Sequence, residues 1–208
     1  MSDSTLEREG YSLAAGMALG LVCLGGGVQA AGLADLHLED KLQRYIDGGV
    51  DLMAPTQQPS SSTRCCRIME SDMVNVDVTA PGATIALGLM FLKSNNAAVA
   101  ARLSIPDTHF LLEHVRPDFV LLRVLSHSLV MWDQVDPTEA WLTSQIPVFL
   151  QQYHAAPSEA GEDLDHEALR QAHANIIAGA CLAIGLRFAG TANKHAQDLL
   201  MHYIHYFA

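Results

Sequence analysis

An eight-residue pattern occurs three times in the chain and constrains its fold more than any other feature. Residues 14–21 are AAGMALGL, residues 82–89 are GATIALGL and residues 179–186 are GACLAIGL, and the three octets align without a gap. Residues four apart are neighbours on the surface of a helix. Positions 1 and 5 of each octet therefore form one column of small residues, the first column, and positions 3 and 7 form a second column.

These columns predict helices that touch closely. A glycine inside a helix costs roughly 1 kcal/mol relative to alanine, so Gly16 and Gly20 need a reason to lie in an apolar helical run. A neighbouring backbone that must approach closely supplies that reason. The residues predicted to pack the repeats in this way are Ala14, Gly16, Ala18, Gly20, Gly82, Thr84, Ala86, Gly88, Gly179, Cys181, Ala183 and Gly185.

A membrane span is the main alternative for the first octet. Residues 10–34 contain no charged side chain and are long enough to cross a bilayer. They also contain seven glycines, including Gly25, Gly26 and Gly27 in a row, and no basic cluster flanks them. Because Arg187 follows the third octet and Lys93 follows the second, the pattern favours a helical solenoid without a membrane span.

Charge and cysteine content exclude several classes of function. The 208 residues contain 12 Lys and Arg against 23 Asp and Glu, a formal net charge of -11, and no basic run. Nucleic-acid backbones need clustered cations, so nucleic-acid binding is disfavoured. The four cysteines have neither zinc-site nor disulfide-framework spacing, and the polar N-terminus does not resemble a signal peptide, so we expect an intracellular protein.

The rest of the chain alternates helical runs with turns. Helices are expected near residues 34–49, 97–105, 108–115, 117–135, 138–153, 165–190 and 192–207. Residues 51–72 have no apolar period and predict a flexible insertion. Residues 74–79, VNVDVT, alternate between apolar and polar side chains and predict a short extended segment. Pro81 is then expected in the first turn of the next helix. Pro147 is expected to kink the helix over 138–153.

No catalytic, cofactor-binding or metal site is predicted. The glycines do not form a nucleotide-binding loop, the histidine pairs lack a convincing third ligand, and Cys65 and Cys66 are best explained as exposed loop residues. Trp132 and Trp141 flank an acidic turn and are candidates for partner binding, although core packing explains either one more simply.

Longer segments around the octets resemble a known family. They read LEREGYSLAAGMALGLVCLG, VNVDVTAPGATIALGLMFLKSNN, PDTHFLLEHVRPDFVLLRVLSHSLVMWD and AHANIIAGACLAIGLRFAGTAN. These segments are similar, in the same order, to the proteasome/cyclosome (PC) repeat domain of the largest subunit of the anaphase-promoting complex. The resemblance covers most of residues 6–193 and leaves the insertion at 51–72 unaligned.

The resemblance implies an all-α fold and a function without catalysis. The expected fold is an α-solenoid of PC-repeat hairpins, part of a toroid, forming one domain over residues 1–208 with one or two very short extended segments. The expected function is that of a scaffold segment in a multisubunit ubiquitin ligase that controls mitosis, located in nucleus and cytoplasm. Its implied partners are the cullin and RING module, the Doc-domain subunit, the TPR subunits and the propeller coactivator. The chain is expected to be part of a longer subunit, and in isolation to self-associate.

Two alternatives remain open from the sequence. PC repeats also occur in the large non-ATPase subunits of the proteasome regulatory particle, which would give the chain a scaffold role in a different assembly. A small helical ligand-binding domain or enzyme is a different class, and it would need a pocket with converging polar groups.

Overall fold

The computed structural model describes residues 3–29, 36–48, 69–70, 73–112, 115–155 and 165–208. The chain divides into two compact units, Met1–Leu92 and Lys93–Ala208. Helices dominate both units, and the strands found in the described residues are two residues long. The prediction of an all-α helical repeat fold with very short extended segments is therefore confirmed, while the prediction of a single domain stays a prediction.

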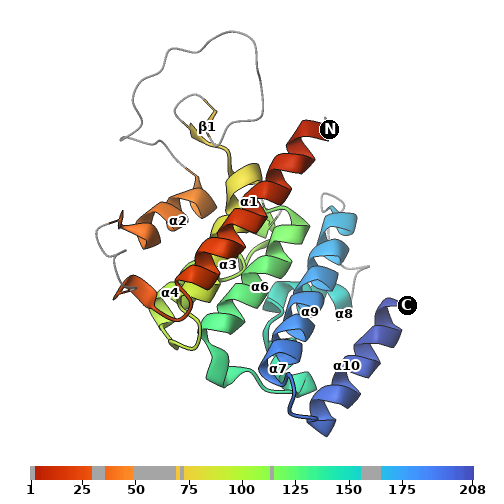
Figure 1. The fold of residues 1–208 in the computed structure, drawn as a ribbon. Coiled ribbons are helices and arrows are strands. Elements are labelled where there is room, and N and C mark those ends of the chain that lie inside the picture. Colours follow the sequence, from red (N-terminus) through yellow and green to blue (C-terminus); the bar gives the residue numbers. More distant parts are fainter. Residues whose placement is uncertain (1–2, 30–35, 49–68, 71–72, 113–114, 156–164) are drawn as a thin grey trace. The chain divides into compact units, whose positions relative to one another are not determined.

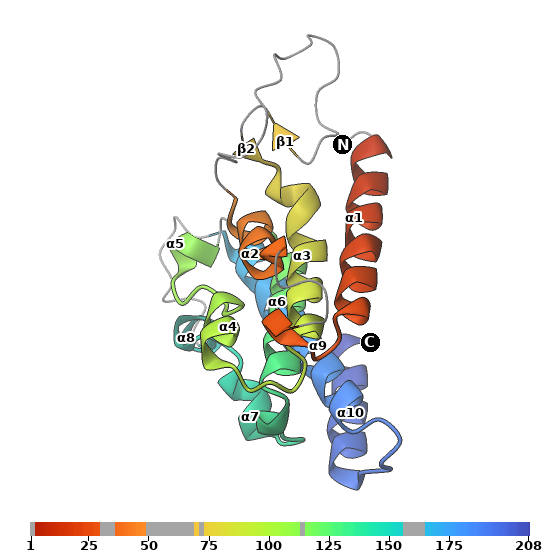
Figure 2. The same ribbon diagram turned by 60° about the vertical axis from the view of Figure 1, so that its left-hand side comes forward.

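The first unit is built around two parallel helices. It contains α1 (Asp3–Val22), η1 (Gly27–Gln29), α2 (Leu38–Asp47), β1 (Met69–Glu70), β2 (Met73–Val74) and α3 (Val76–Met90). Helices α1 and α3 run side by side in the same direction, and α2 packs on α3 (Figures 1 and 2). At the end of this pair the Gly25 amide, in a residue with φ of 65°, donates to the Leu89 carbonyl at 3.1 Å. A helix that returns between two parallel helices is the expected unit of a solenoid.

Helix α2 meets α3 through one apolar face. Leu42 and Ile46, four residues apart on this face, are buried. The helix ends at Gly48, whose φ of 81° suits a residue without a β-carbon. The buried Thr79 hydroxyl of α3 also donates to the carbonyl of Tyr45 in α2 at 2.7 Å. This hydrogen bond joins the two helices near the start of α3.

The start of α3 differs from the sequence expectation. The helix begins at Val76, so Pro81 lies inside it and is not in its first turn. The expectation of an extended segment over residues 74–79 is correct only for Val74 and Asn75. Proline lacks an amide hydrogen and normally disfavours the preceding helical turn. Here the Thr79 side chain contacts both Tyr45 and the Asn75 carbonyl, which anchors that turn. A tertiary contact therefore outweighs the local preference.

The second unit has a larger core. Its elements are α4 (Ala97–Arg102), α5 (His109–Leu112), α6 (Pro117–Val130), η3 (Trp132–Gln134), α7 (Glu139–Ser144), α8 (Val148–Ala155), α9 (His166–Arg187) and α10 (Lys194–Phe207). Helices α6 and α9 lie side by side and run in the same direction, like α1 and α3 (Figure 1). Their buried contacts include Val120 and Val124 of α6 and Ile176 and Ala180 of α9.

Short helices cover this pair. The expected kink at Pro147 is a complete break, because α7 ends at Ser144 and α8 starts at Val148. Leu142 of α7 and Leu150 of α8 then both reach the core of α6 and α9. The predicted insertion at 51–72 lies outside the described residues except for Met69 and Glu70, and Cys65 and Cys66 also lie outside them.

Candidate protein-protein interface

The second column of α1 faces the first column of α3. A β-carbon added to Gly16 would overlap the carbonyl group of Gly82, and one added to Gly82 would overlap the carbonyl oxygen of Ser12. One turn further along, a β-carbon on Gly20 would lie 3.0 Å from the Cα atom of Ala86 and 2.8 Å from the Leu89 Cβ atom. The small residues thus allow two helix backbones to touch over successive turns.

In the octet of α9, the first column contacts the preceding parallel helix, α6. A β-carbon on Gly179 would lie 2.7 Å from the Leu121 carbonyl oxygen and 3.0 Å from the Val124 Cβ atom, both in α6. Ala183, the other member of this column, is buried. Helix α6 precedes α9 in the chain, as α1 precedes α3. First columns therefore contact the preceding parallel helix, and in α1 the second column contacts the following one.

Two columns do not match the sequence expectation of helix contact. Ala14 and Ala18, the first column of α1, are exposed. In the second column of α9, Cys181 is half-buried, and a β-carbon on Gly185 would meet nothing within 4 Å. The expectation that Gly185 packs against a helix therefore has no counterpart among the contacts of the described residues and stays a prediction. Thr84 and Gly88, the second column of α3, are buried.

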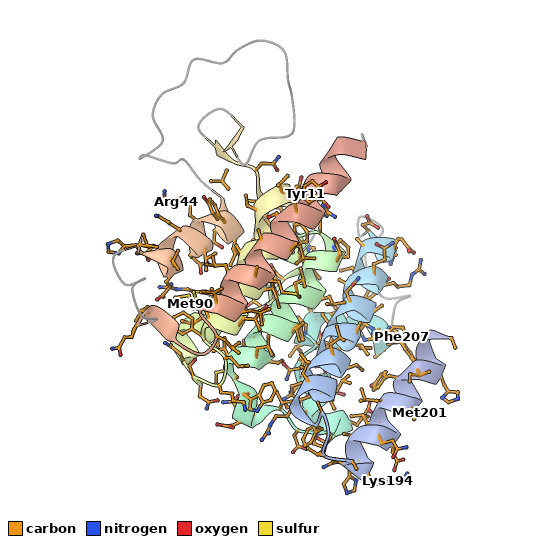
Figure 3. All side chains as sticks on the ribbon, viewed as in Figure 1. Tyr11, Arg44, Met90, Lys194, Met201 and Phe207 are labelled. Carbon is orange, nitrogen blue, oxygen red and sulfur yellow. The ribbon has the colours of Figure 1, made fainter. Side chains whose placement is uncertain are left out.

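The open column of α9 lines an apolar groove. Helix α10 runs beside α9 and forms the other wall, with Met201 and Phe207 labelled along it in Figure 3. The groove has a volume of about 670 Å³ and is open to solvent. It is lined by Ala178, Cys181, Leu182, Gly185, Leu186, Leu200, Tyr203, Ile204, Phe207 and Ala208. No charged side chain is among these residues.

The two polar groups of this groove are held in their neutral forms. Burial, and then the Glu139 carboxylate, raise the pKa of the Cys181 thiol to about 11. Burial likewise raises the pKa of Tyr203, whose hydroxyl donates to the Glu139 carboxylate at 2.6 Å. A neutral thiol is a poor nucleophile, and the tyrosine hydroxyl is already engaged. The groove is therefore suited to apolar contact, as between two helices.

The tryptophans have different environments. Trp141 is half-buried and packs against both hydrophobic clusters of the second unit, so it belongs to the core. Trp132 is half-buried in η3, and two cations stack on it, with Lys93 Nζ 4.8 Å and the Arg187 guanidinium 5.5 Å from the ring centroid. Trp141 is therefore explained by core packing. Trp132 instead makes cation-π contacts with Lys93 and Arg187.

The structure contains a histidine cluster that was not predicted from the sequence. His154 of α8 and His173 of α9 stack with ring centroids 4.3 Å apart, and Tyr153 hydrogen-bonds to His166 at 2.7 Å. Burial, and then His154, lower the pKa of the buried His173 imidazole. The signal in the sequence was weak, because these residues are close only after α8 folds back on α9. Across the described parts of the chain, no cluster of three or more His, Cys, Asp or Glu side chains could hold a metal ion.

None of the helices in the described residues combines the length and the apolarity needed to cross a membrane.

Known proteins resemble the chain over nearly its whole length. A family model described as the APC1 fifth domain matches residues 1–208. Anaphase-promoting complex subunit 1 of Homo sapiens is 44% identical over 199 residues, which cover 93% of this chain and 10% of that protein. The Arabidopsis thaliana protein of the same name is 43% identical over 212 residues, covering 98% of this chain and 12% of that protein.

A fungal relative has a different name. "Negative regulator of mitosis" of Emericella nidulans is 34% identical over 204 residues, covering 97% of this chain and 9% of that protein. The chain thus spans about a tenth of the length of these relatives.

Proposed function

Because the chain belongs to the APC1 fifth-domain family, we propose that it is a non-catalytic scaffold segment of an anaphase-promoting complex. In this role it holds other subunits of a ubiquitin ligase at fixed positions during mitosis. The observation that carries the scaffold role is the stacking of parallel helices through glycine contacts, Gly16 on Gly82 and Gly179 on Leu121. Such stacks present long surfaces, which suit binding to several proteins at once.

The family match favours this assembly over the proteasome regulatory particle. The relatives that are at least 40% identical carry the name anaphase-promoting complex subunit 1. We propose the cullin and RING module, the Doc-domain subunit, the TPR subunits and the propeller coactivator as partners of the assembly, and nucleus and cytoplasm as its location.

The groove between α9 and α10 argues against a small-molecule site. Ligand pockets place several polar groups around an apolar cavity. Here the Tyr203 hydroxyl is bound to Glu139, and the thiol of Cys181 is kept protonated. An open apolar wall of two helices is better suited to a third helix than to a polar metabolite.

A chimeric subunit tests the proposal. In human cells depleted of their own subunit 1, the matched segment of a tagged human protein would be replaced by this chain, and the purified material analysed by mass spectrometry. We expect the chimera to recover the other subunits of the complex and to restore mitotic exit. A version in which the segment is deleted is the control, and recovery no better than with that control would contradict the proposal.

A further inference from the structure

Trp132 is contacted by two cations from distant parts of the second unit. Lys93 lies in the turn before α4, and Arg187 lies in the last turn of α9. The Lys93 Nζ atom is 4.8 Å and the Arg187 guanidinium carbon 5.5 Å from the centroid of the Trp132 ring. The two charges are therefore no further apart than the sum of these distances. The ring attracts both cations, although they repel each other.

The turn that carries Lys93 is held in place by hydrogen bonds. The Lys93 amide donates to the Leu129 carbonyl of α6, and the Asn95 amide donates to the Val130 carbonyl, both at 3.0 Å. The side-chain amide of Asn95 also donates to the Asp133 carboxylate at 2.7 Å. These bonds fix the turn on the end of α6 and on η3. A partner that binds here does not have to order this turn, which lowers the entropic cost of binding.

Neither cation is neutralised by a carboxylate of the described residues. Lys93 and Arg187 form no ion pair there. The nearest acidic residue in the sequence, Asp133, has its carboxylate on Asn95. The buried Nε atom of Arg187 has no hydrogen-bond partner in the described structure. Two positive charges beside a half-buried tryptophan are thus available to an anion, and Trp and Arg are the residues that contribute most often to protein interfaces.

The ends of α6 and α9 indicate which kind of anion fits. Helix α6 ends at Val130 and α9 ends at Arg187, so the last carbonyl groups of two helices, with their partial negative charge, lie near the cations. A compact dianion such as phosphate is typically held by the amide groups of a helix N-terminus. Singly charged carboxylates spaced along a peptide are repelled less by these carbonyl groups, and each can pair with one cation.

We infer that Lys93, Trp132 and Arg187 form a binding site for an acidic segment of a partner protein, with carboxylates on the two cations and the segment against the indole ring. This inference goes beyond the proposed function and does not depend on it. Because the chain has a formal net charge of -11, long-range attraction does not favour an acidic segment. Binding therefore comes from these local contacts.

An NMR titration of the isotope-labelled chain tests the site. The probe is a diglutamate peptide with blocked ends, and the signals followed are the indole N–H groups of Trp132 and Trp141 at constant ionic strength. We expect a saturable shift at Trp132 and little change at Trp141, which packs in the core. No saturable shift at Trp132 would overturn the inference, as would an equal shift with the uncharged diglutamine peptide. A phosphoserine peptide that binds more tightly than diglutamate would overturn the choice of carboxylates.

Removing the two charges tests the residues themselves. Lys93→Gln combined with Arg187→Gln should weaken binding of the diglutamate peptide roughly tenfold or more, because both charge-assisted contacts are lost. Lys93→Gln alone changes an exposed side chain and should weaken binding by a smaller factor. This single variant keeps the test decisive if the double variant does not fold. Either variant binding as tightly as the parent would overturn the inference.

The matched control is Arg170→Gln combined with Lys194→Gln. It removes one arginine and one lysine charge as well, but each of these exposed cations already pairs with a carboxylate at 2.6 Å. Figure 3 labels Lys194 at the start of α10. We expect the affinity for the diglutamate peptide to change by less than about twofold, since exposed ion pairs contribute little. A loss as large as that of the Lys93 and Arg187 double variant would show that net charge alone drives binding, which would overturn the site.

Discussion

The backbone of Gly82 in α3 occupies the place where a β-carbon on Gly16 of α1 would stand. Close approach of this kind needs glycine in both helices, because Gly82 in turn lies against the Ser12 carbonyl. The glycines that weaken each helix by itself thereby permit the contact that holds the pair together.

Replacing Gly82 with alanine should destabilise the first unit. The new methyl group overlaps the Ser12 carbonyl, and overpacking costs about 1–3 kcal/mol, which exceeds the gain of about 1 kcal/mol in helix propensity. Urea denaturation followed by circular dichroism measures the change. Gly10→Ala, in open space on α1, is the control and should stabilise the chain. If Gly82→Ala also stabilises it, the close contact is absent in solution.

Two glycines of the same helix should respond with opposite signs. Gly179→Ala in α9 forces a methyl group against the Leu121 carbonyl oxygen and should lower the melting temperature. Gly185→Ala meets open space and should raise stability by up to about 1 kcal/mol through helix propensity. Differential scanning calorimetry of both variants checks the pair, and equal shifts would contradict the different environments of the two columns.

The buried hydroxyl of Thr79 should contribute to stability through its hydrogen bond to Tyr45. Thr79→Val keeps the shape but leaves the Tyr45 carbonyl without this donor, so we expect a loss of about 0.5–1.5 kcal/mol in the free energy of unfolding. Thr79→Ser keeps the hydroxyl and serves as the comparison in the same urea titration. A valine variant as stable as the parent would show that the bond contributes nothing.

The N-cap of α9 offers a separate test. The Asp165 carboxylate accepts hydrogen bonds from the amides of Glu167 and Ala168. Asp165→Ala should therefore cost about 1 kcal/mol, whereas Asp165→Asn, which keeps an acceptor, should cost much less. Chemical denaturation of the three proteins measures both values. Similar losses for alanine and asparagine would point to charge, and not to the cap, as the source.

Stability should decrease on acidification because of two histidines, the buried His173 and the half-buried His127. Burial lowers the pKa of His173 and of His127 in the folded chain, so the unfolded chain, with a pKa of about 6.5, binds protons more readily. Stability from these groups is complete above pH of about 6.5 and is lost as the pH falls toward their folded-state pKa values. Thermal melts should show a shallower decrease below pH of about 6.5 for His173→Gln than for the parent. His202→Gln, at an exposed site on α10, should leave the profile unchanged.

The octets by themselves were sufficient to predict an all-α repeat fold. Helix periodicity is a local property, so the pattern AAGMALGL in residues 14–21 already places Gly16 and Gly20 on one face, wherever the helix lies. The break at Pro147 and the helix end at Gly48 also depend on local sequence. Proline restricts the backbone angles, and glycine permits a positive φ.

The tertiary structure decided which of those faces have neighbours. Gly20 and Gly185 occupy the same octet position, yet Gly20 is covered by α3 and Gly185 opens onto a groove. Tertiary packing also explains why α3 begins before Pro81, since Thr79 of α3 contacts Tyr45 of α2. The same kind of packing stacks His154 on His173. These outcomes depend on residues distant in the chain, whose approach is set by the packing of whole helices. The sequence determined the helices and their small columns, and only packing determined which columns are occupied.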